Sequence, residues 1–471
     1  MTGTVTSLSR AFSRYQPWRA AVCFCVEFLL ISGMVVLATV IRFSRHAFLL
    51  DHGLMYLPHA LLTALVCQGC MYYADLYDLR AALHGSKLFL QVLQSLAAAA
   101  VVLAVLFYLM PSMVLGRGVL LLSMGCIVGV ISGWRLFFQW LLTMRQLTMK
   151  ILIVGTGEEA RRVARELLDR RSLGYEITGF IDDDPAKLGM SIVNPRVIGN
   201  SEQLPEIVEQ ERVDKIVIAL PDRRGKLPLE ALLTCKLHGV EVEDGTTFYE
   251  RLSGRVMLEN LRPSWLIFSQ GFTVLPLTGL VKRLFDMVLA TVGLVLGIPL
   301  AILIAVLIKL DSYGPIFFTQ ERVGQYSKLF TLIKFRSMCI DAEGETGPVF
   351  ADQCDSRITR IGRFLRVTRL DELPQLLNVL AGDMSFVGPR PERPFFVKQF
   401  EKEIPYYNQR LSVKPGITGW AQVNYSYGAN AEDAIEKLQL DLYYIKNMSI
   451  WLDLCIILKT LKIVVLGQGA R

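Results

Sequence analysis

Four long apolar runs in the first third of the chain limit the folds that are open to this sequence. They lie at about 20–41, 54–76, 88–110 and 118–142. Each run has the roughly 20 residues that a helix needs to cross the hydrocarbon of a bilayer. Hydrophobic residues make up 52% of the 471-residue chain. Together these features predict a membrane protein with a four-helix transmembrane domain over residues 1–149.

Basic residues favour one orientation of these helices. They precede the first run, separate the second from the third, and follow the fourth, at Arg10, Arg14, Arg19, Arg80, Lys87, Arg145 and Lys150. By the positive-inside rule, both ends of this domain should lie in the cytoplasm. The net charge of +7 is concentrated in the apolar parts of the chain, which favours anionic lipid or a phosphorylated ligand over nucleic acid as a partner.

Two charged residues fall inside the apolar runs. Glu27 lies in the first run, where an acid is a functional candidate unless it reaches the interface or pairs with Arg19. Arg135 lies near the inner end of the fourth run, and we expect its long side chain to snorkel to the membrane surface.

Residues 150–245 alternate between strand and helix patterns. We expect strands at 150–154, 175–181 and 214–220, and helices at 158–171, 201–211 and 226–238. Strands that alternate with helices of this length predict a Rossmann-like α/β domain with a parallel sheet.

The first turn of this domain, Gly155–Ala160, fits a relaxed dinucleotide-binding fingerprint. Asp182 follows the second strand, where it could reach a ribose hydroxyl. However, Glu158 and Glu159 would place negative charge at the mouth of the anion site, and the domain lacks a Tyr-x-x-x-Lys pair for redox chemistry. We therefore expect a structural or regulatory domain and assign no cofactor-binding residues.

A linker at 246–280 should lead to a third domain, residues 281–471. This domain opens with an apolar stretch over 282–310 that is interrupted at Pro299. Proline in a helix interior removes a hydrogen bond and kinks the helix. A re-entrant helix would return the chain to the cytoplasmic face, whereas a straight fifth span would place the polar C-terminal part outside.

The last 200 residues contain no histidine, since all five lie at or before His238, so carboxylates are the main candidates for catalysis there. Arginines recur every three residues at Arg357, Arg360, Arg363, Arg366 and Arg369. At this spacing they rotate around a helix and cannot all face one ligand. Most of them fit a basic helix that lies on anionic headgroups.

Asp371 and Glu372 directly follow this cationic run and precede Pro374. Because proline is tolerated in the first turn of a helix, Asp371 should lie at a helix N-terminus, where the dipole and nearby arginines favour its ionised form. Such a carboxylate could attack phosphorus and bind Mg²⁺. The alternative is an N-cap followed by a first-turn glutamate.

Three further segments supply groups for phosphate recognition. Arg390 lies on a constrained turn between Pro389 and Pro391, which suits bidentate contact with a phosphate. Lys334 and Arg336 follow a strand-like run, and the loop 414–422 adds an aromatic platform.

Together these motifs resemble the bacterial sugar transferase family, the polyprenyl-phosphate hexose-1-phosphate transferases. The match covers about residues 280–471. It is carried by Lys282-Arg283-x-x-Asp286, Gly314–Gly324, Lys334–Met338, Asp371–Gln375 and Gly382–Pro391. The remainder resembles the large members of this family, with four N-terminal transmembrane helices and a Rossmann-like insert.

The resemblance implies a monotopic, α-rich catalytic domain with a re-entrant membrane helix at 282–310. Asp371 would be the nucleophile and contact Mg²⁺, and Glu372 would complete the catalytic dyad. The substrate-binding residues would be Lys334, Arg336, Arg366, Pro389, Arg390 and Pro391. One departure is Ile298-Pro299, where many members have Ser-Pro, which leaves the depth of the turn undetermined.

The resemblance thus implies transfer of a hexose-1-phosphate from a UDP-sugar to undecaprenyl phosphate, with release of UMP, at the start of exopolysaccharide synthesis. The enzyme would lie in a bacterial inner membrane with its active site on the cytoplasmic face. Membrane lipids, a second copy in a homodimer and downstream glycosyltransferases are the expected partners. A membrane-bound nucleotide-sugar dehydratase or epimerase, or a non-catalytic nucleotide-sensing scaffold, remain the alternatives.

Overall fold

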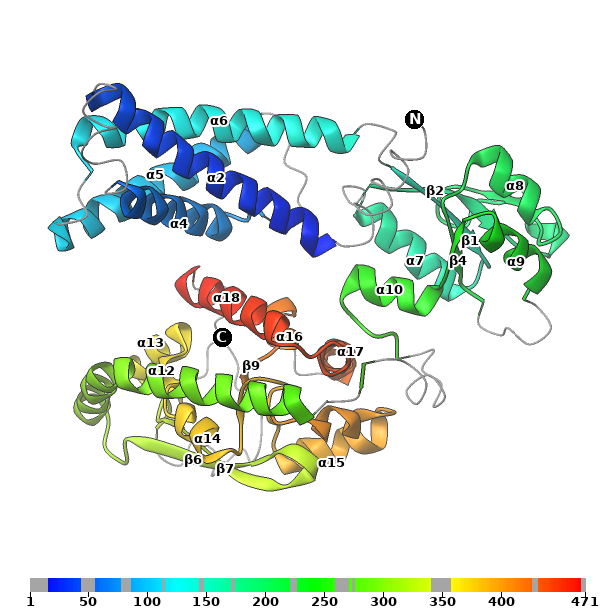
Figure 1. The fold of residues 1–471 in the computed structure, drawn as a ribbon. Helices are drawn as coiled ribbons and strands as arrows, with labels where there is room; N and C mark the ends of the chain where they lie inside the picture. Colours follow the sequence, from blue (N-terminus) through cyan, green and yellow to red (C-terminus); the bar gives the residue numbers. More distant parts are fainter. Residues whose placement is uncertain are drawn as a thin grey trace. The chain divides into compact units, whose positions relative to one another are not determined.

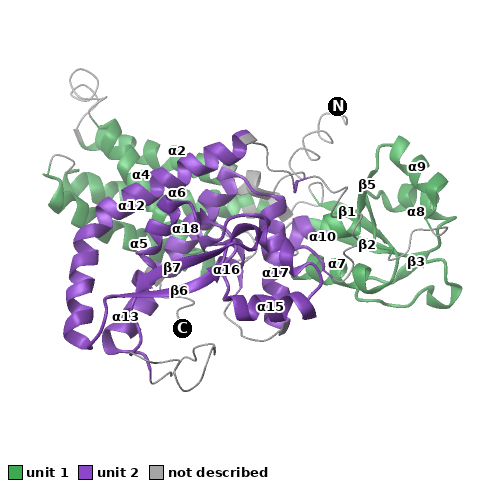
Figure 2. Cartoon of the chain, turned by 90° about the horizontal axis from the view of Figure 1, so that it is seen from below, with its two compact units in different colours: residues 1–248 green, residues 249–471 purple. Residues whose placement is uncertain are grey.

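The fold is taken from a computed structural model, and it divides into two compact units, residues 1–248 and 249–471 (Figure 2). The residues that the structure describes are 16–43, 56–77, 86–111, 115–143, 148–170, 174–220, 227–258, 271–272, 276–339, 357–425 and 431–466. Each unit is considered by itself below.

The first unit begins with a bundle of long apolar helices (Figure 1). They are α2 Gln16–Phe43, α4 Leu57–Tyr73, α5 Ser86–Leu109 and α6 Arg117–Thr143. Segments 22–42, 86–109 and 117–138 are long and apolar enough to span a membrane, and 28% to 33% of each is buried. Helix α4, with 17 residues, is at the short end of the spanning range. The four apolar runs therefore form helices, as predicted.

Glu27 and Arg135 form an ion pair inside this bundle. Glu27 is fully buried and Arg135 is 7% exposed. Arg135 Nε lies 2.9 Å from Glu27 Oε1, and Nη2 donates to Oε2 at 3.0 Å. Its Nη1 donates to the carbonyl of Leu76. Arg135 therefore does not snorkel but pairs with Glu27, because a bidentate pair compensates both charges in the bundle interior. The side chain of Arg19, the partner considered for Glu27, lies outside the described part of the chain.

A five-stranded parallel sheet forms the rest of the first unit. Its strands are β1 Met149–Val154, β2 Tyr175–Ile181, β3 Val197–Gly199, β4 Lys215–Ile218 and β5 Glu241–Asp244, in the order β3-β2-β1-β4-β5. Helices α7 Glu158–Asp169, α8 Leu204–Glu211 and α9 Leu229–Leu237 alternate with them. The expected parallel α/β arrangement is confirmed, and the short strands β3 and β5 are additions to it.

The glycine-rich turn after β1 has its polar side chains engaged by their neighbours. Gly155 has a φ of +112°, and a Cβ there would lie 2.4 Å from the carbonyl of Ala219. The Asp182 carboxylate accepts from Lys187 Nζ at 3.1 Å and from the Thr156 hydroxyl. Contrary to expectation, Glu159 turns inward: it is 4% exposed and accepts from Thr246 Oγ1 at 3.0 Å.

The segment predicted to be a linker, 246–280, contains most of one helix and the start of another. Helix α10 comprises Gly245–Ser253. Its Phe248 is fully buried and its ring contacts that of Tyr175 in the first unit. The second unit starts at Tyr249, and Val256 is fully buried in its core. The division therefore falls at 248/249, because hydrophobic side chains within 246–280 belong to the two cores.

The second unit is mainly helical. It contains two short sheets, the antiparallel hairpin β6 Phe317–Val323 with β7 Leu329–Phe335, and the parallel pair β8 Ser385–Val387 with β9 Gly416–Thr418. The helices are α12 Pro276–Asp311, α13 Arg360–Thr368, α14 Gln375–Ala381, α15 Pro394–Glu403, α16 Trp420–Asn424, α17 Ala431–Lys446 and α18 Ile450–Leu466. The 3-10 helix η8, Tyr407–Ser412, links α15 to β9.

Helix α12 is the longest helix of this unit, and it bends partway along (Figure 2). Its 36 residues include Pro299 and would span about 54 Å if the helix were straight. Leu373 contacts both halves: it packs with the cluster around Ala290 and with the cluster around Ile304. A Cβ on Gly297 would lie 3.2 Å from Leu373, so the absence of a side chain there permits this close approach.

Both ends of α12 are fixed to the same unit. Lys282 Nζ lies 2.6 Å from Asp453 Oδ2, and the Asp311 carboxylate accepts from the Ile361 amide at 3.0 Å. The window of α12 that is apolar enough to span a membrane is only 11% buried. The helix therefore rests on its own domain with one face and leaves a wide apolar face uncovered.

Candidate active site

Asp371 and Glu372 lie in one turn of 3-10 helix, Leu370–Glu372, between α13 and α14. The chain reverses just before this turn at Arg369, whose φ of 54° ends α13. Pro374 then caps α14. The dyad is thus held between two helices, and Asp371 lies next to a helix N-terminus, as predicted.

The surroundings of Asp371 raise its pKa to about 6. Burial is the largest cause, since this side chain is only 8% exposed, and the charge of Glu372 adds to it. The positive charges of Lys334, Arg390 and Arg366 oppose the rise. Arg390 and Arg366 do favour the ionised form, as predicted, but burial and the charge of Glu372 outweigh them and raise the pKa. Asp371 nevertheless remains mostly ionised at neutral pH.

Arg390 connects the dyad to a second loop. Its Nη2 donates to Glu372 Oε1 at 3.1 Å, and its Nη1 donates to Gln422 Oε1 at 3.2 Å. Arg369 Nη1 reaches the same Gln422 oxygen at 3.5 Å. Gln422 ends the loop 414–422, and it was not assigned to the site from the sequence. No spacing in the sequence showed that this loop meets the dyad.

Close backbone contacts hold these two loops together. The Gly388 amide donates to the Thr418 carbonyl at 2.8 Å, and the Gly416 amide donates to the Pro389 carbonyl at 2.9 Å. A Cβ on Gly388 would lie 2.4 Å from the Lys414 carbonyl, and one on Gly416 would lie 2.0 Å from the Gly388 amide. Glycine is required at both positions because the two chains touch through their backbones.

Lys334 and Arg366 bring two further cations toward Asp371. Lys334 lies on β7, opposite Phe318 in the hairpin, and its ammonium sits 5.1 Å from the centre of that ring. Burial lowers the pKa of Lys334, and the charge of Asp371 opposes this. Arg366, in the last turn of α13, is half-buried and acts electrostatically on Asp371.

Arg336 does not join this group. It is 5% exposed, and its Nη1 donates to the Tyr313 carbonyl at 2.7 Å. Its Nη2 lies 2.8 Å from both the carbonyl and the hydroxyl of Ser312. These contacts give Arg336 a structural role at the end of α12, so the prediction that it binds substrate is not supported.

The remaining arginines of α13 face outward. Arg360 and Arg363 are exposed, as are Phe364 and Val367 at 58% and 43%. At 100° per residue these four side chains lie on one face of the helix. An exposed face that combines two arginines with apolar side chains suits contact with anionic headgroups. The other three arginines of the series, Arg357, Arg366 and Arg369, are half-buried, so contact of most of the series with headgroups stays a prediction.

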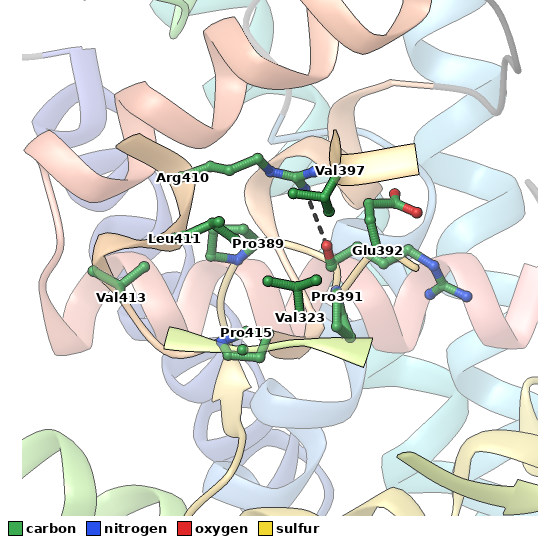
Figure 3. Close-up of a pocket in the computed structure, with 11 residues that line it drawn as sticks. Val323, Pro389, Pro391, Glu392, Val397, Arg410, Leu411, Val413 and Pro415 are labelled. Carbon is green, nitrogen blue, oxygen red and sulfur yellow. Dashed lines mark hydrogen bonds between the residues drawn. The ribbon is translucent and has the colours of Figure 1, made fainter. Parts of the chain in front are cut away.

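A small pocket lies beside the turn 389–392, which carries Arg390 (Figure 3). Pro389, Pro391 and Glu392 line one side of it, and most other lining side chains are apolar. Asp371 and Glu372 are not among the lining residues. The pocket is therefore separate from the dyad and lies among the residues that pack against the turn 389–392. Pro389 and Pro391, which were expected to bind substrate, restrict the backbone on either side of Arg390.

Residues 277–467 match the sequence model of a family described as bacterial sugar transferase. A glucose-1-phosphate transferase of Xanthomonas campestris, which uses UDP-glucose and undecaprenyl phosphate, is 34% identical over 347 residues. That alignment covers 70% of this chain and 69% of the relative. The chain belongs to the bacterial sugar transferase family.

Other relatives carry related names. An N-acetylgalactosaminephosphotransferase of Aeromonas hydrophila is 45% identical over 51% of this chain, and a glucose phosphotransferase of Komagataeibacter xylinus is 34% identical over 69%. Both act on undecaprenyl phosphate according to their names. The chain spans 56% and 61% of their lengths. Residues 72–242 match a model described as a CoA-binding domain.

The dyad fits a magnesium ion as part of the ligand set. Mg²⁺ is usually held by one or two carboxylates together with phosphates of the substrate. Asp371 and Glu372 are adjacent, and the charge of Glu372 helps to raise the pKa of Asp371, so a cation between them would relieve this repulsion. No group of three potential metal ligands occurs among the described residues, which leaves the other positions to phosphate and water.

Asp371→Asn should stabilise the folded protein at pH 8 by about 1–3 kcal/mol. Because the pKa of Asp371 is raised from 3.8 to about 6 on folding, the folded state binds more protons than the unfolded state between these values. The contribution of Asp371 to the free energy of unfolding therefore falls as the pH rises from about 4 to 6, and Asn removes this effect.

Melting curves of the detergent-solubilised protein at pH 8 and pH 4 measure this difference. The stability gain should be present at pH 8 and be much smaller at pH 4, where the carboxyl is protonated in the folded state and partly protonated in the unfolded state. Glu401→Gln, at an exposed position of α15, is the matched control and should leave the melting temperature unchanged at both values. Equal melting curves for Asp371→Asn and wild type at pH 8 would contradict the raised pKa.

Proposed function

We propose that this protein transfers a sugar-1-phosphate from a UDP-sugar to undecaprenyl phosphate and releases UMP. The observation that carries the proposal is the buried carboxylate of Asp371. It lies beside Glu372 and is subject to the positive charges of Lys334, Arg366 and Arg390. A carboxylate with a pKa of about 6 is ionised at cytoplasmic pH, and cations around it can bind a diphosphate. The names of the relatives supply the substrate class.

The reaction proceeds in two displacements at one phosphorus atom. A carboxylate oxygen of Asp371 attacks the β-phosphorus of the UDP-sugar, the bond from that phosphorus to the bridging oxygen breaks, and UMP leaves with the oxygen. A phosphate oxygen of the lipid then attacks the phosphosugar on Asp371 and releases the free carboxylate. The scheme is ping-pong, with a covalent intermediate between the two steps.

The surrounding residues have separate tasks in this scheme. Arg390 and Arg366 bind the diphosphate and balance the charge that develops at phosphorus. Lys334 keeps Asp371 ionised by opposing the effects of burial and of Glu372. Asp371 and Glu372 would hold Mg²⁺, which would supply further positive charge to the diphosphate.

The bend in α12 supports a position at the membrane surface. One substrate is soluble and the other stays in the bilayer, so the site must lie at the level of the headgroups. We infer that α12 enters the bilayer from the cytoplasmic face and returns, with its uncovered apolar face in lipid. The exposed arginines of α13 would then contact anionic headgroups of a bacterial inner membrane.

UMP release from a panel of UDP-sugars, mixed with enzyme and undecaprenyl phosphate, tests the proposed reaction. Repeated turnover that requires both enzyme and lipid phosphate is the expected result, with at most one equivalent of UMP per enzyme released when the lipid is left out. This result would place the chain at the first lipid-linked step of a polysaccharide. Consumption of a UDP-sugar without UMP release, with formation of a modified sugar nucleotide, would favour a dehydratase or epimerase instead.

Reporter fusions after residues 150 and 471 should both be active on the cytoplasmic side. The first position follows the four-helix domain, and the second lies beyond α12, so a re-entrant α12 leaves both in one compartment. Alkaline phosphatase and green fluorescent protein fusions make the measurement, since each is active on one side only. A periplasmic C-terminal reporter would show that α12 crosses the membrane and would contradict the proposed location of the site.

A further inference from the structure

Arg410 and Asp441 form a buried ion pair next to the turn 389–392. The proposed reaction does not use this pair. Arg410, in η8, is 6% exposed, and Asp441, in α17, is 1% exposed. Arg410 Nη2 lies 2.9 Å from Asp441 Oδ2. Burial of two charges is costly unless other groups compensate for the lost water, so the contacts of this ion pair indicate what it does.

The guanidinium of Arg410 makes two further hydrogen bonds. Its Nη2 donates to the backbone carbonyl of Arg390 at 3.0 Å, the contact drawn in Figure 3. Its Nη1 donates to the Tyr407 hydroxyl at 2.7 Å. The planar guanidinium thus joins Asp441 and Tyr407 on one side to the residue that contacts the dyad on the other.

Each backbone carbonyl of the turn 389–392 accepts a hydrogen bond from another part of the unit. The donors to Pro389, Arg390, Pro391 and Glu392 are, in order, the Gly416 amide at 2.9 Å, Arg410 Nη2 at 3.0 Å, Arg322 Nη1 at 3.1 Å and the Val323 amide at 3.0 Å. The backbone of Arg390 is therefore fixed at its own carbonyl and at both neighbours.

This fixation determines where the Arg390 side chain can reach. Its guanidinium meets Glu372 and Gln422 at 3.1 and 3.2 Å, and a small rotation of the backbone would move a side chain of this length by more than a hydrogen-bond tolerance. Of the four carbonyl contacts, the one to Arg390 itself comes from a buried arginine whose orientation Asp441 sets. Lysine could not make all three contacts, because it lacks the planar fork.

We propose that Arg410, oriented by Asp441, is a positioning residue that holds the backbone of Arg390 so that its guanidinium faces the dyad. The consequence for turnover rests on the proposed function, in which Arg390 binds the diphosphate. The positioning itself is a property of the folded chain and can be tested without substrate.

Hydrogen exchange measures the positioning directly. In Arg410→Lys, the peptide that covers 385–393 should exchange faster than in wild type, while peptides of α14 and β7 exchange at the wild-type rate. Glu250→Gln, which removes the charge of another buried pair in this unit, with Lys446 at 2.6 Å, is the matched control. It should leave exchange in 385–393 unchanged. Unchanged exchange of this peptide in Arg410→Lys would overturn the proposal, whatever reaction the protein carries out.

A double-mutant cycle then tests the consequence for turnover. Arg410→Lys should lower kcat/KM for the UDP-sugar about tenfold, and the double variant with Arg390→Ala should be no worse than Arg390→Ala alone, since Arg410 acts through Arg390. Losses that multiply in the double variant would show that Arg410 acts independently of Arg390. If wild-type protein releases no UMP, the proposed function fails, and the exchange result still decides the positioning.

Discussion

Asp371→Asn should lower the rate of UMP release by at least about a thousandfold, or about 4 kcal/mol of transition-state stabilisation. Asparagine keeps the size and shape of the side chain, but it has no charged oxygen to attack phosphorus. Because the same substitution should stabilise the protein at pH 8, loss of folding cannot explain the loss of rate. A coupled assay for UMP under single-turnover conditions gives the measurement.

The covalent intermediate provides an independent check on this residue. Wild-type protein incubated with a labelled UDP-sugar and no lipid should retain label, and Asp371→Asn should retain none. Peptide mapping of the labelled protein should locate the phosphosugar on Asp371. Label on a different side chain, or substantial turnover by the Asn variant, would show that the mechanism is wrong even though the family assignment stands.

Glu372→Gln should also lower turnover, although for a different reason. Glu372 accepts a hydrogen bond from Arg390 and raises the pKa of Asp371 by its charge. Removal of this charge should lower the pKa of Asp371 below about 6, so the acid limb of the pH–rate profile should move to lower pH. The fall in turnover reports the role of Glu372 in holding Arg390, and the movement of the acid limb reports its effect on the pKa of Asp371.

The sequence allowed the main elements to be predicted where one local pattern decides the structure. Apolar runs of about 20 residues indicated the membrane helices. The alternation of strands and helices indicated the parallel sheet, and Pro374 placed the dyad beside a helix start. These patterns are local, so they can be interpreted without knowing which distant segments meet.

Features that depend on distant contacts could not be predicted in the same way. Glu27 and Arg135 are 108 positions apart, and nothing near either residue indicates the other. Arg336 looked like a phosphate ligand because it follows Lys334 by two residues, but β7 ends at Phe335, and the Arg336 guanidinium donates to Ser312 and Tyr313 instead. The pKa of Asp371 depends on how deeply the side chain is buried, which spacing does not show.

The same limitation applies to the support of the site. Arg410 and Asp441 are separated by a loop and by two other elements, and each would be an ordinary charged residue in a helix. Only the packed structure shows that both are buried and that they meet the carbonyl of Arg390. Motifs therefore indicated the groups to which we assign the chemistry, whereas the groups that we propose to position them became visible through burial and hydrogen bonding.

Arg390→Ala should lower kcat/KM for the UDP-sugar by about a hundredfold or more, as is typical when one donor to a developing charge is removed. The side chain contacts Glu372 and lies close enough to Asp371 to lower its pKa. Its removal should therefore raise the pKa of Asp371 above about 6, and the acid limb of the kcat/KM profile should move to higher pH. Initial rates measured from pH 5 to 9 at low UDP-sugar concentration test both effects.

Two further variants separate charge from geometry in this prediction. Arg390→Lys keeps the positive charge but loses the two-pronged contact, so it should retain the wild-type acid limb while kcat/KM still falls more than tenfold. Arg360→Ala removes an exposed arginine of α13 and should lower the rate less than tenfold, with no movement of the limb. If Arg390→Ala lowered the rate with the limb unchanged, Arg390 would bind substrate without acting on the nucleophile. A loss no larger than that of Arg360→Ala would remove Arg390 from the proposed site, because an arginine that contacts the dyad should matter more than one on the exposed face of α13.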